Sequence, residues 1–194
     1  MRKIILSLFG ILLLLVPTAF SATYQIDPSH TQVHFTVPHL MVFKVRGNFN
    51  DFAGTVEVDG AEKTLSAASA VIQTASIDTR NQKRDDHLRS ADFFEAEKYP
   101  EISFVSKNVT GSGSDITVTG DLTIKGVTKE VTLSGGFLGA ATDPWGNQRA
   151  GFEATGKINR GDFGLTWNKA LETGGVVVGD EVEIGLEVEA VLKK

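Results

Sequence analysis

The sequence predicts an all-β protein, an eight-stranded antiparallel β-barrel with one short helix closing an end. Segments throughout the chain alternate apolar and polar residues with a period of two, which is the pattern of strands with one face in a core and one in water. Short links with turn residues, such as Lys125–Gly126, imply that neighbouring strands are antiparallel. Closure into a barrel is favoured because an open sheet would leave exposed edges.

The expected strands are most regular toward the end of the chain. In "EVEIGLEVEAVL" (181–192), every even-numbered residue is apolar and most of the others are glutamate. The alternation in residues 45–58 changes parity near Gly54, which predicts a β-bulge. The other expected strands cover residues 33–37, 69–77, 101–106, 115–124, 127–135 and 150–158.

One segment, residues 78–100, is highly charged and lacks the period of two. It contains a helical stretch from about Gln82 to Ser90. Its apolar anchors are Leu88, Phe93 and Phe94. We therefore expect a short helix and a following turn that pack on one end of the barrel through these three side chains.

The first 21 residues have the layout of a secretory signal peptide. Two basic residues precede an apolar run over residues 4–16, and the small residues Ala19 and Ser21 fit cleavage before Ala22. The run is shorter than the roughly 20 residues of a membrane-spanning helix, so an uncleaved anchor is the weaker alternative. We expect export, and a single domain over residues 22–194.

The charge and the lack of cysteine exclude several classes of function. The signal peptide holds two of the 19 basic residues, which leaves the mature chain 17 basic against 24 acidic residues, a net charge of −7. This sign argues against binding of nucleic acid and against adsorption to anionic lipid headgroups. The chain contains no cysteine, which excludes disulfides, thiol catalysis and cysteine metal sites.

Three of the four histidines, His30, His34 and His39, lie close together in the sequence and raise the question of a metal site. In a strand, His30 and His34 share one face and His39 falls on the other. A zinc site needs ligands that converge on one point. We therefore expect no metal here, and hydrogen bonds at the strand ends for His30 and His39.

Catalytic motifs are equally scarce. The sequence contains neither Gly-x-Ser-x-Gly nor His-Glu-x-x-His. Asp85, Asp86 and His87 could supply acid/base groups, but adjacent charged residues on a helix usually face water. The interior of the barrel remains: eight strands enclose a space that side chains just fill or that holds one small ligand. Periodicity alone leaves the solid core and the hollow barrel as open alternatives.

Four stretches, taken in order, resemble the YceI-like polyisoprenoid-binding family. They are "YQIDPSHTQVHFTVPHLMVFKVRGNFNDFAGTV", "ASIDTRNQKRDDHLRSADFFEAEKYPEISF", "GDLTIKGVTKEVTL" and "DPWGNQRAGFEATGKINRGDFGL". The resemblance runs across nearly the whole mature chain. It implies a periplasmic, lipocalin-like barrel with a long apolar tunnel. It also implies a long-chain amphiphile as ligand (an isoprenoid quinone, a polyprenyl phosphate or a fatty-acid derivative), with no metal and no cofactor.

We therefore expect a binding, carrier or sequestering protein that is not an enzyme, is monomeric or homodimeric, and contacts a membrane or a membrane protein only transiently. One alternative is an enzyme that acts on a lipid within the barrel, with His87 and Asp86 or His39 as acid/base groups. The other is a solid-cored stress or assembly protein. Arg46, Lys83 and Arg84 are candidates for contact with a polar head group. The residues expected to line the tunnel are Phe35, Val37, Phe43, Phe49, Phe52, Ile72, Leu88, Phe93, Phe94, Phe104, Leu122, Leu133, Phe137, Phe152, Phe163 and Trp167.

Overall fold

A computed structural model of the chain describes residues 21–59, 64–172 and 174–193, which form strands and one α-helix. The expected signal peptide lies outside these residues, except for Ser21, the first residue of β1. Two short 3-10 helices, Thr74–Ser76 and Arg160–Phe163, interrupt the strands. The elements are β1 (Ser21–Ile26), β2 (Gln32–His39), β3 (Phe43–Phe49), β4 (Phe52–Asp59), β5 (Thr64–Gln73), β6 (Ile77–Asp78), α1 (Gln82–Arg89), β7 (Glu101–Ser112), β8 (Asp115–Ile124), β9 (Val127–Thr142), β10 (Gln148–Asn159) and β11 (Glu181–Leu192).

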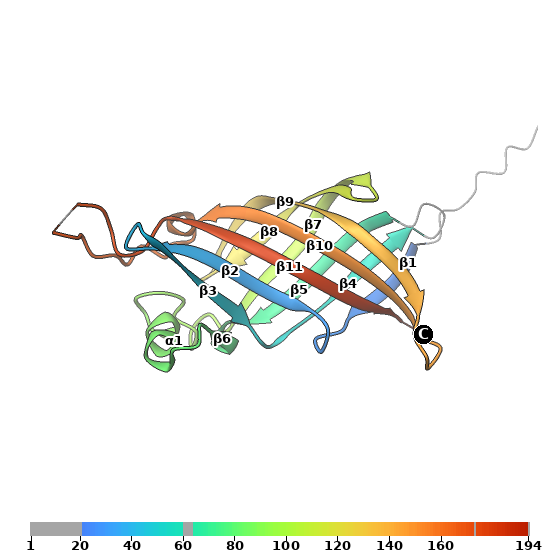
Figure 1. Cartoon of the computed structure of the whole chain (residues 1–194), viewed down its shortest axis with the longest axis horizontal. Helices are drawn as coiled ribbons and strands as arrows, with labels where there is room; N and C mark the ends of the chain where they lie inside the picture. The colour runs from blue at the N-terminus through green and yellow to red at the C-terminus, as the bar shows by residue number, and fades with distance from the viewer. Residues whose placement is uncertain (1–20, 60–63, 173, 194) are drawn as a thin grey trace, which may run out of the picture.

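Eight of the strands close into an antiparallel barrel, which confirms the predicted fold class. They follow the order β1-β4-β5-β7-β8-β9-β10-β11, and β1 pairs back onto β11 with Tyr24 opposite Leu192. Figure 1 shows these strands running obliquely along the long axis of the molecule. Closure leaves no free edge along this ring, as expected for a sheet with one apolar face.

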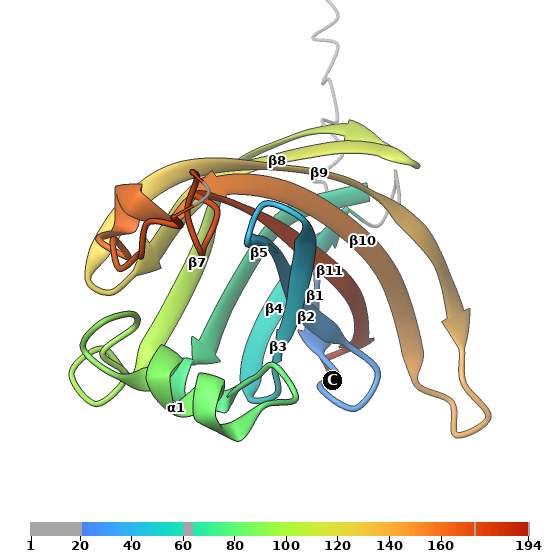
Figure 2. The same cartoon turned by 60° about the vertical axis from the view of Figure 1, so that its left-hand side comes forward.

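The strands β2, β3 and β6 form an extension of the barrel that we call the side sheet. β2 pairs with the same edge of β11 that β1 uses, but farther from the C-terminus, with Val33 opposite Leu186. β3 pairs with β2, and β6 pairs with the end of β3 through Phe49 and Ile77. Figure 2 shows α1 spanning the space between the side sheet and β7. β1 and β2 thus share the role of one barrel strand.

The strand pattern between residues 45 and 58 differs from the expectation. The structure has two strands there, separated by Asn50 and Asp51. The backbone N–H of Asn50 donates to the carbonyl of Ser76 at 3.2 Å, and the carbonyl of Asp51 accepts from the N–H of Gln73 at 2.8 Å. The change of parity therefore comes from a turn, and the expected bulge at Gly54 is wrong. The irregularity in the β4–β5 pairing falls between Glu57 and Val58.

The helix α1 begins and ends within one residue of the prediction. The side chain of Asn81 caps it by accepting a hydrogen bond from the N–H of Arg84 at 3.2 Å. Ser90 has an extended backbone, which ends the helix after Arg89. No helix among the described residues is long and apolar enough to cross a membrane.

Candidate functional site

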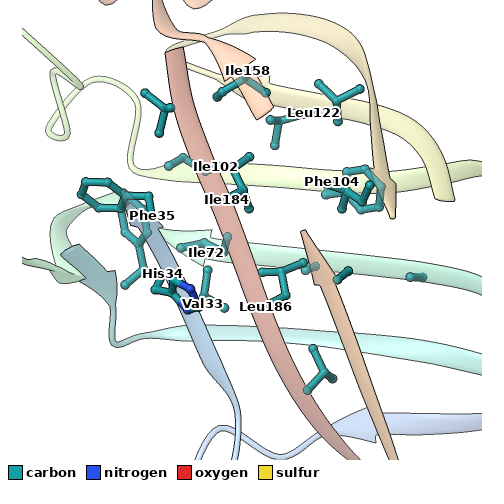
Figure 3. Close-up of a pocket in the computed structure, with 18 of the residues that line it drawn as sticks. Val33, His34, Phe35, Ile72, Ile102, Phe104, Leu122, Ile158, Ile184 and Leu186 are labelled. Carbon is teal, nitrogen blue, oxygen red and sulfur yellow. The ribbon is translucent and has the colours of Figure 1, made fainter. Parts of the chain in front are cut away.

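The barrel encloses an apolar cavity of about 250 Å³. Its lining comes from strands all around the barrel, from the side sheet and from the α1 region. Figure 3 shows lining residues of β2, β5, β7, β8, β10 and β11. For comparison, an engineered cavity of about 150 Å³ with an aliphatic and aromatic lining stays dry and takes up benzene. A cavity of the present size therefore favours an apolar occupant over water.

The period-two pattern explains how the strands build this wall. In β8 the even-numbered Ile116, Val118, Leu122 and Ile124 all line the cavity. The same holds for the even-numbered Val182, Ile184, Leu186 and Val188 near the start and middle of β11. Their odd-numbered neighbours include the glutamates and threonines of the outer surface.

Most of the residues predicted from the sequence to line the tunnel do line this cavity. These eleven are Phe35, Val37, Phe49, Ile72, Leu88, Phe93, Phe94, Phe104, Leu122, Leu133 and Phe152.

The other five predicted residues lie elsewhere. Phe43 is the clearest error, because its side chain is 70% exposed at the start of β3. Phe52 and Phe163 are buried but do not face the cavity. Phe137 packs behind the wall against Phe152, with ring centroids 5.3 Å apart. Trp167 supports the wall from outside through its ring contact with Phe93 at 5.2 Å.

Among the wall residues that sequence reasoning missed, Arg160 is the one that is both buried and charged. It is buried at the start of the second 3-10 helix and lies beside the cavity. Its guanidinium donates to the backbone carbonyls of Leu165, Trp167 and Gly179, the last two at 3.0 and 2.9 Å. It also pairs with the carboxylate of Asp180 at 3.2 Å. Arg160 therefore holds residues 165–167 and 178–180 against the barrel, and its donors are already used.

The comparisons with known proteins agree with this architecture. A family model described as a YceI-like domain matches residues 24–190. The chain belongs to the YceI-like family. It is 41% identical to Protein YceI of Escherichia coli O17:K52:H18 and 39% identical to Protein YceI of Salmonella agona. The first alignment covers 100% of both proteins, and the second covers 96% of this chain and 95% of the relative.

Solved structures show the same YceI-like fold. BcnA of Burkholderia cenocepacia is 26% identical with a TM-score of 0.74, over 85% of this chain and 99% of that one. A YCEI protein of Campylobacter jejuni is 35% identical with a TM-score of 0.70, over 81% and 90%. A domain of Saccharophagus degradans, described as polyisoprenoid binding, is 15% identical with a TM-score of 0.61, over 89% and 99%. This last likeness concerns the fold alone.

None of the three head-group candidates of this YceI-like chain is among the residues that line the cavity in the described part. The guanidinium of Arg84 donates to the hydroxyl and the carbonyl oxygen of Thr79, both at 2.8 Å. Arg46 is exposed on the outer face of β3, where it helps to lower the pKa of Glu183 after the larger effect of Lys44. Lys83 is exposed on α1.

The three neighbouring histidines of the YceI-like barrel have different partners. His30 precedes β2, and its Nδ1 lies 2.9 Å from a carboxylate oxygen of Asp27. His34 lies in β2, with its Nδ1 3.2 Å from a carboxylate oxygen of Glu187. His39 ends β2, where its backbone bridges to Val178.

Asp27, His30 and Glu189 come within 4.8 Å of one another in a group that could hold a cation. Arg149 already supplies the positive charge: its Nη1 lies 2.8 Å from an oxygen of Asp27 and also bonds Glu189. Hydrogen bonds from Ser29, Arg149 and His30 hold the pKa of the Asp27 carboxyl well below its usual range. We read the group as an ion-pair cluster that joins the start of the barrel to β10 and β11.

The possible acid/base residues of α1 are engaged in local contacts. The buried carboxylate of Asp85 accepts from the backbone N–H of Thr79 at 2.9 Å and from its hydroxyl at 2.5 Å. Asp86 bonds the side chains of Gln82 and Arg89 at 2.7 and 3.2 Å. His87 lies 2.8 Å from the carboxylate of Asp92. Each group therefore has a structural role in positioning α1.

Proposed function

We propose that this chain is a periplasmic protein that binds a long-chain amphiphilic lipid in its apolar cavity, as a carrier or a sequestering protein, and catalyses no reaction. The observation that carries the proposal is the cavity of about 250 Å³ with its apolar lining. The fold supports it, since a protein of this fold from Saccharophagus degradans is described as a polyisoprenoid binding domain. The apolar N-terminal run supports export.

The energetics suit a carrier. Each methylene removed from water contributes about 0.8 kcal/mol, so the part of a prenyl chain that enters the cavity strongly favours it over water. The true competitor is the membrane, whose interior is as apolar as the cavity wall. Transfer from bilayer to barrel is then nearly balanced in free energy, and a lipid can be both taken up and released.

We assign the polar head of the lipid to the end of the barrel covered by α1. Leu88 on α1 lines the cavity, and Lys83 is exposed on the same helix. Lys83 is the most accessible of the candidates there, because Arg84 is bound to Thr79. A phosphate or carbonyl at this end would meet a cation that is free to move toward it.

The two alternatives have less support. An enzyme with His87 and Asp86, or His39, as acid/base groups would need them beside the cargo, yet none of the three is among the described residues that line the cavity. His87 and Asp86 are held by neighbouring side chains of the α1 region. A solid-cored protein would have little void within its barrel, which the cavity of about 250 Å³ argues against.

The deciding experiment is native mass spectrometry of the protein purified from its own host's periplasm without detergent. The proposal expects an added mass that extracts into organic solvent, and the extract then separates quinone, polyprenyl phosphate and fatty-acid derivative. A protein that is bare when isolated, and still bare after incubation with each of the three lipids, would refute the binding function. Absence of the protein from the periplasmic fraction would refute the location alone.

A further inference from the structure

The turn between β2 and β3, together with the first residue of β3, carries four large apolar side chains in succession, which we call the apolar tip. They are exposed by 39% (Leu40), 63% (Met41), 86% (Val42) and 70% (Phe43). Leu40 and Met41 have left-handed backbone conformations, with φ of 52° and 62°. Such positions favour Gly or Asn. The chain thus places bulky apolar residues in solvent at a turn where small or polar ones would be more stable.

The apolar tip is held in place by the segment that follows the second 3-10 helix. The N–H of Leu40 donates to the carbonyl of Val177 at 2.9 Å, and the carbonyl of Pro38 accepts from the N–H of Gly179 at 2.9 Å. Figure 1 shows both segments projecting together at one end of the molecule. The exposure of the tip therefore belongs to a fixed hairpin.

The base of the tip is part of the cavity wall. Val37 lies three residues before Leu40, and Val178 is bridged to His39. Both Val37 and Val178 line the cavity. A surface that covered the tip would therefore lie against the rim of the cavity.

The size of the tip argues against a second copy of the chain as its partner. A stable dimer buries about 800 Å² on each partner. Even a fully exposed aromatic side chain offers only about 150–250 Å². Four side chains with the exposures given above fall short of what a dimer needs. A bilayer has no such requirement, because each apolar side chain partitions into it separately.

We propose that the apolar tip inserts into a lipid bilayer and sets the rim of the cavity against the membrane surface. The inference rests on the proposed function, since it supplies the place where an apolar cargo would pass between membrane and barrel. The net charge, −5 for the whole chain and −7 without the expected signal peptide, argues against attraction to anionic headgroups as the cause. Insertion is then driven by apolar burial, so it needs no anionic lipid, and the negative charge of the protein opposes it on anionic vesicles at low salt.

The test compares the full chain with the double variant Val42→Ser/Phe43→Ser by co-flotation with vesicles. One set of vesicles is pure phosphatidylcholine, and the other contains phosphatidylcholine and phosphatidylglycerol in equal parts. We expect the unmodified chain to float with pure phosphatidylcholine at low and high salt, and to bind the anionic vesicles no more strongly. The double variant should bind at least about tenfold more weakly, because it loses the two most exposed apolar side chains of the tip.

The control is Val105→Ser/Leu138→Ser, which removes two other exposed apolar side chains, 55% and 63% exposed, from β7 and β9. It should bind vesicles like the unmodified chain. The inference is overturned if the unmodified chain does not float, if the tip variant floats equally well, or if sedimentation shows a dimer that the tip variant dissociates. Uptake of a lipid by extraction assay tests the binding function separately, since the tip variant keeps the cavity intact.

Discussion

Arg160 donates a hydrogen bond of 3.0 Å to the backbone carbonyl of Trp167, seven residues farther along the chain. The same guanidinium bonds the carbonyls of Leu165 and Gly179. Replacement by Met should lower the free energy of unfolding by at least about 3 kcal/mol, because several buried carbonyls lose their donor at about 1–3 kcal/mol each. Denaturant titration measures this loss. The control Lys157→Met removes an exposed ion pair and should change stability little. An equally small loss of stability in the Arg160 variant would mean that water replaces the hydrogen bonds of Arg160.

Bulk added inside the cavity should displace the lipid without unfolding the barrel. Ala154 lines the cavity, and the next residue, Thr155, is exposed on the outer face of β10. We expect Ala154→Phe to lower the amount of co-purified lipid severalfold, while Thr155→Phe retains it. The void gives the new ring space, so the usual overpacking cost of about 1–3 kcal/mol should be largely avoided. Equal lipid content in the two variants would place the ligand elsewhere.

Removal of the lipid should destabilise the protein. An unfilled cavity of this size costs on the order of 6 kcal/mol at about 24 cal/mol per Å³, and any ligand that fills it stabilises the folded state. We expect a lower calorimetric Tm after organic extraction, and recovery when a long-chain lipid is added back. A Tm that is the same before and after extraction would show that the cavity is not where the lipid binds.

Acid should weaken the ion-pair cluster around Arg149. Folding lowers the pKa of Asp27 below its ordinary value of 3.8. The contribution of Asp27 to the free energy of unfolding is therefore complete above about pH 4 and falls as the pH drops below that value. Burial raises the pKa of Asp143, but hydrogen bonds from Asn147 and Arg149 lower it further, so the net shift is downward. Asp143 therefore also loses its stabilising contribution as the pH falls. Asp27→Asn should be less stable at pH 7, and its stability should decline less steeply below pH 4.

Denaturant titration from pH 7 to pH 2 checks the acid dependence, with Asp162→Asn as the control at an exposed carboxylate. The control should follow the unmodified chain throughout. A parallel decline of Asp27→Asn and the unmodified chain would assign the acid sensitivity to other groups.

The head-group assignment predicts an effect that depends on the lipid. Lys83→Ala should reduce retention of a polyprenyl phosphate severalfold and leave a quinone unaffected, because only the phosphate gains from a nearby cation. Extraction of protein loaded with equal amounts of the two lipids measures the ratio. Lys129→Ala on the exposed face of β9 is the control. An unchanged ratio in Lys83→Ala would move the head group away from α1.

The sequence predicted the wall of the cavity well where the strands are regular. In β8 and β11 the side-chain period is two, so each apolar residue in the alternation points inward. The helix α1 could be predicted because its segment is highly charged and lacks the period of two, so it could not form a strand of the apolar cavity wall. The residues at the ends of strands were predicted less well. Phe43 follows the alternation of β3 but lies beyond the barrel, at a turn whose position no periodicity reveals.

The pairing of strands was the larger gap. That β1 and β2 share one edge of β11 depends on contacts between residues more than 150 positions apart, such as Val33 with Leu186. No local pattern encodes such a partner. Arg160 was missed for a related reason: a lone arginine after a strand looks like a surface charge until its bonds to Trp167 and Gly179 are seen.

β1 and β2 pair with different parts of the same edge of β11, and this arrangement predicts which strands separate first. The side sheet can separate from β11 between Gln32 and Thr36 while the ring, closed by β1, keeps its hydrogen bonds. Amide hydrogen exchange should then reveal two cooperative units, a slow ring and a faster side sheet. On the proposed function, the residence time of a cargo would follow the faster unit, and its release would not require the ring to unfold.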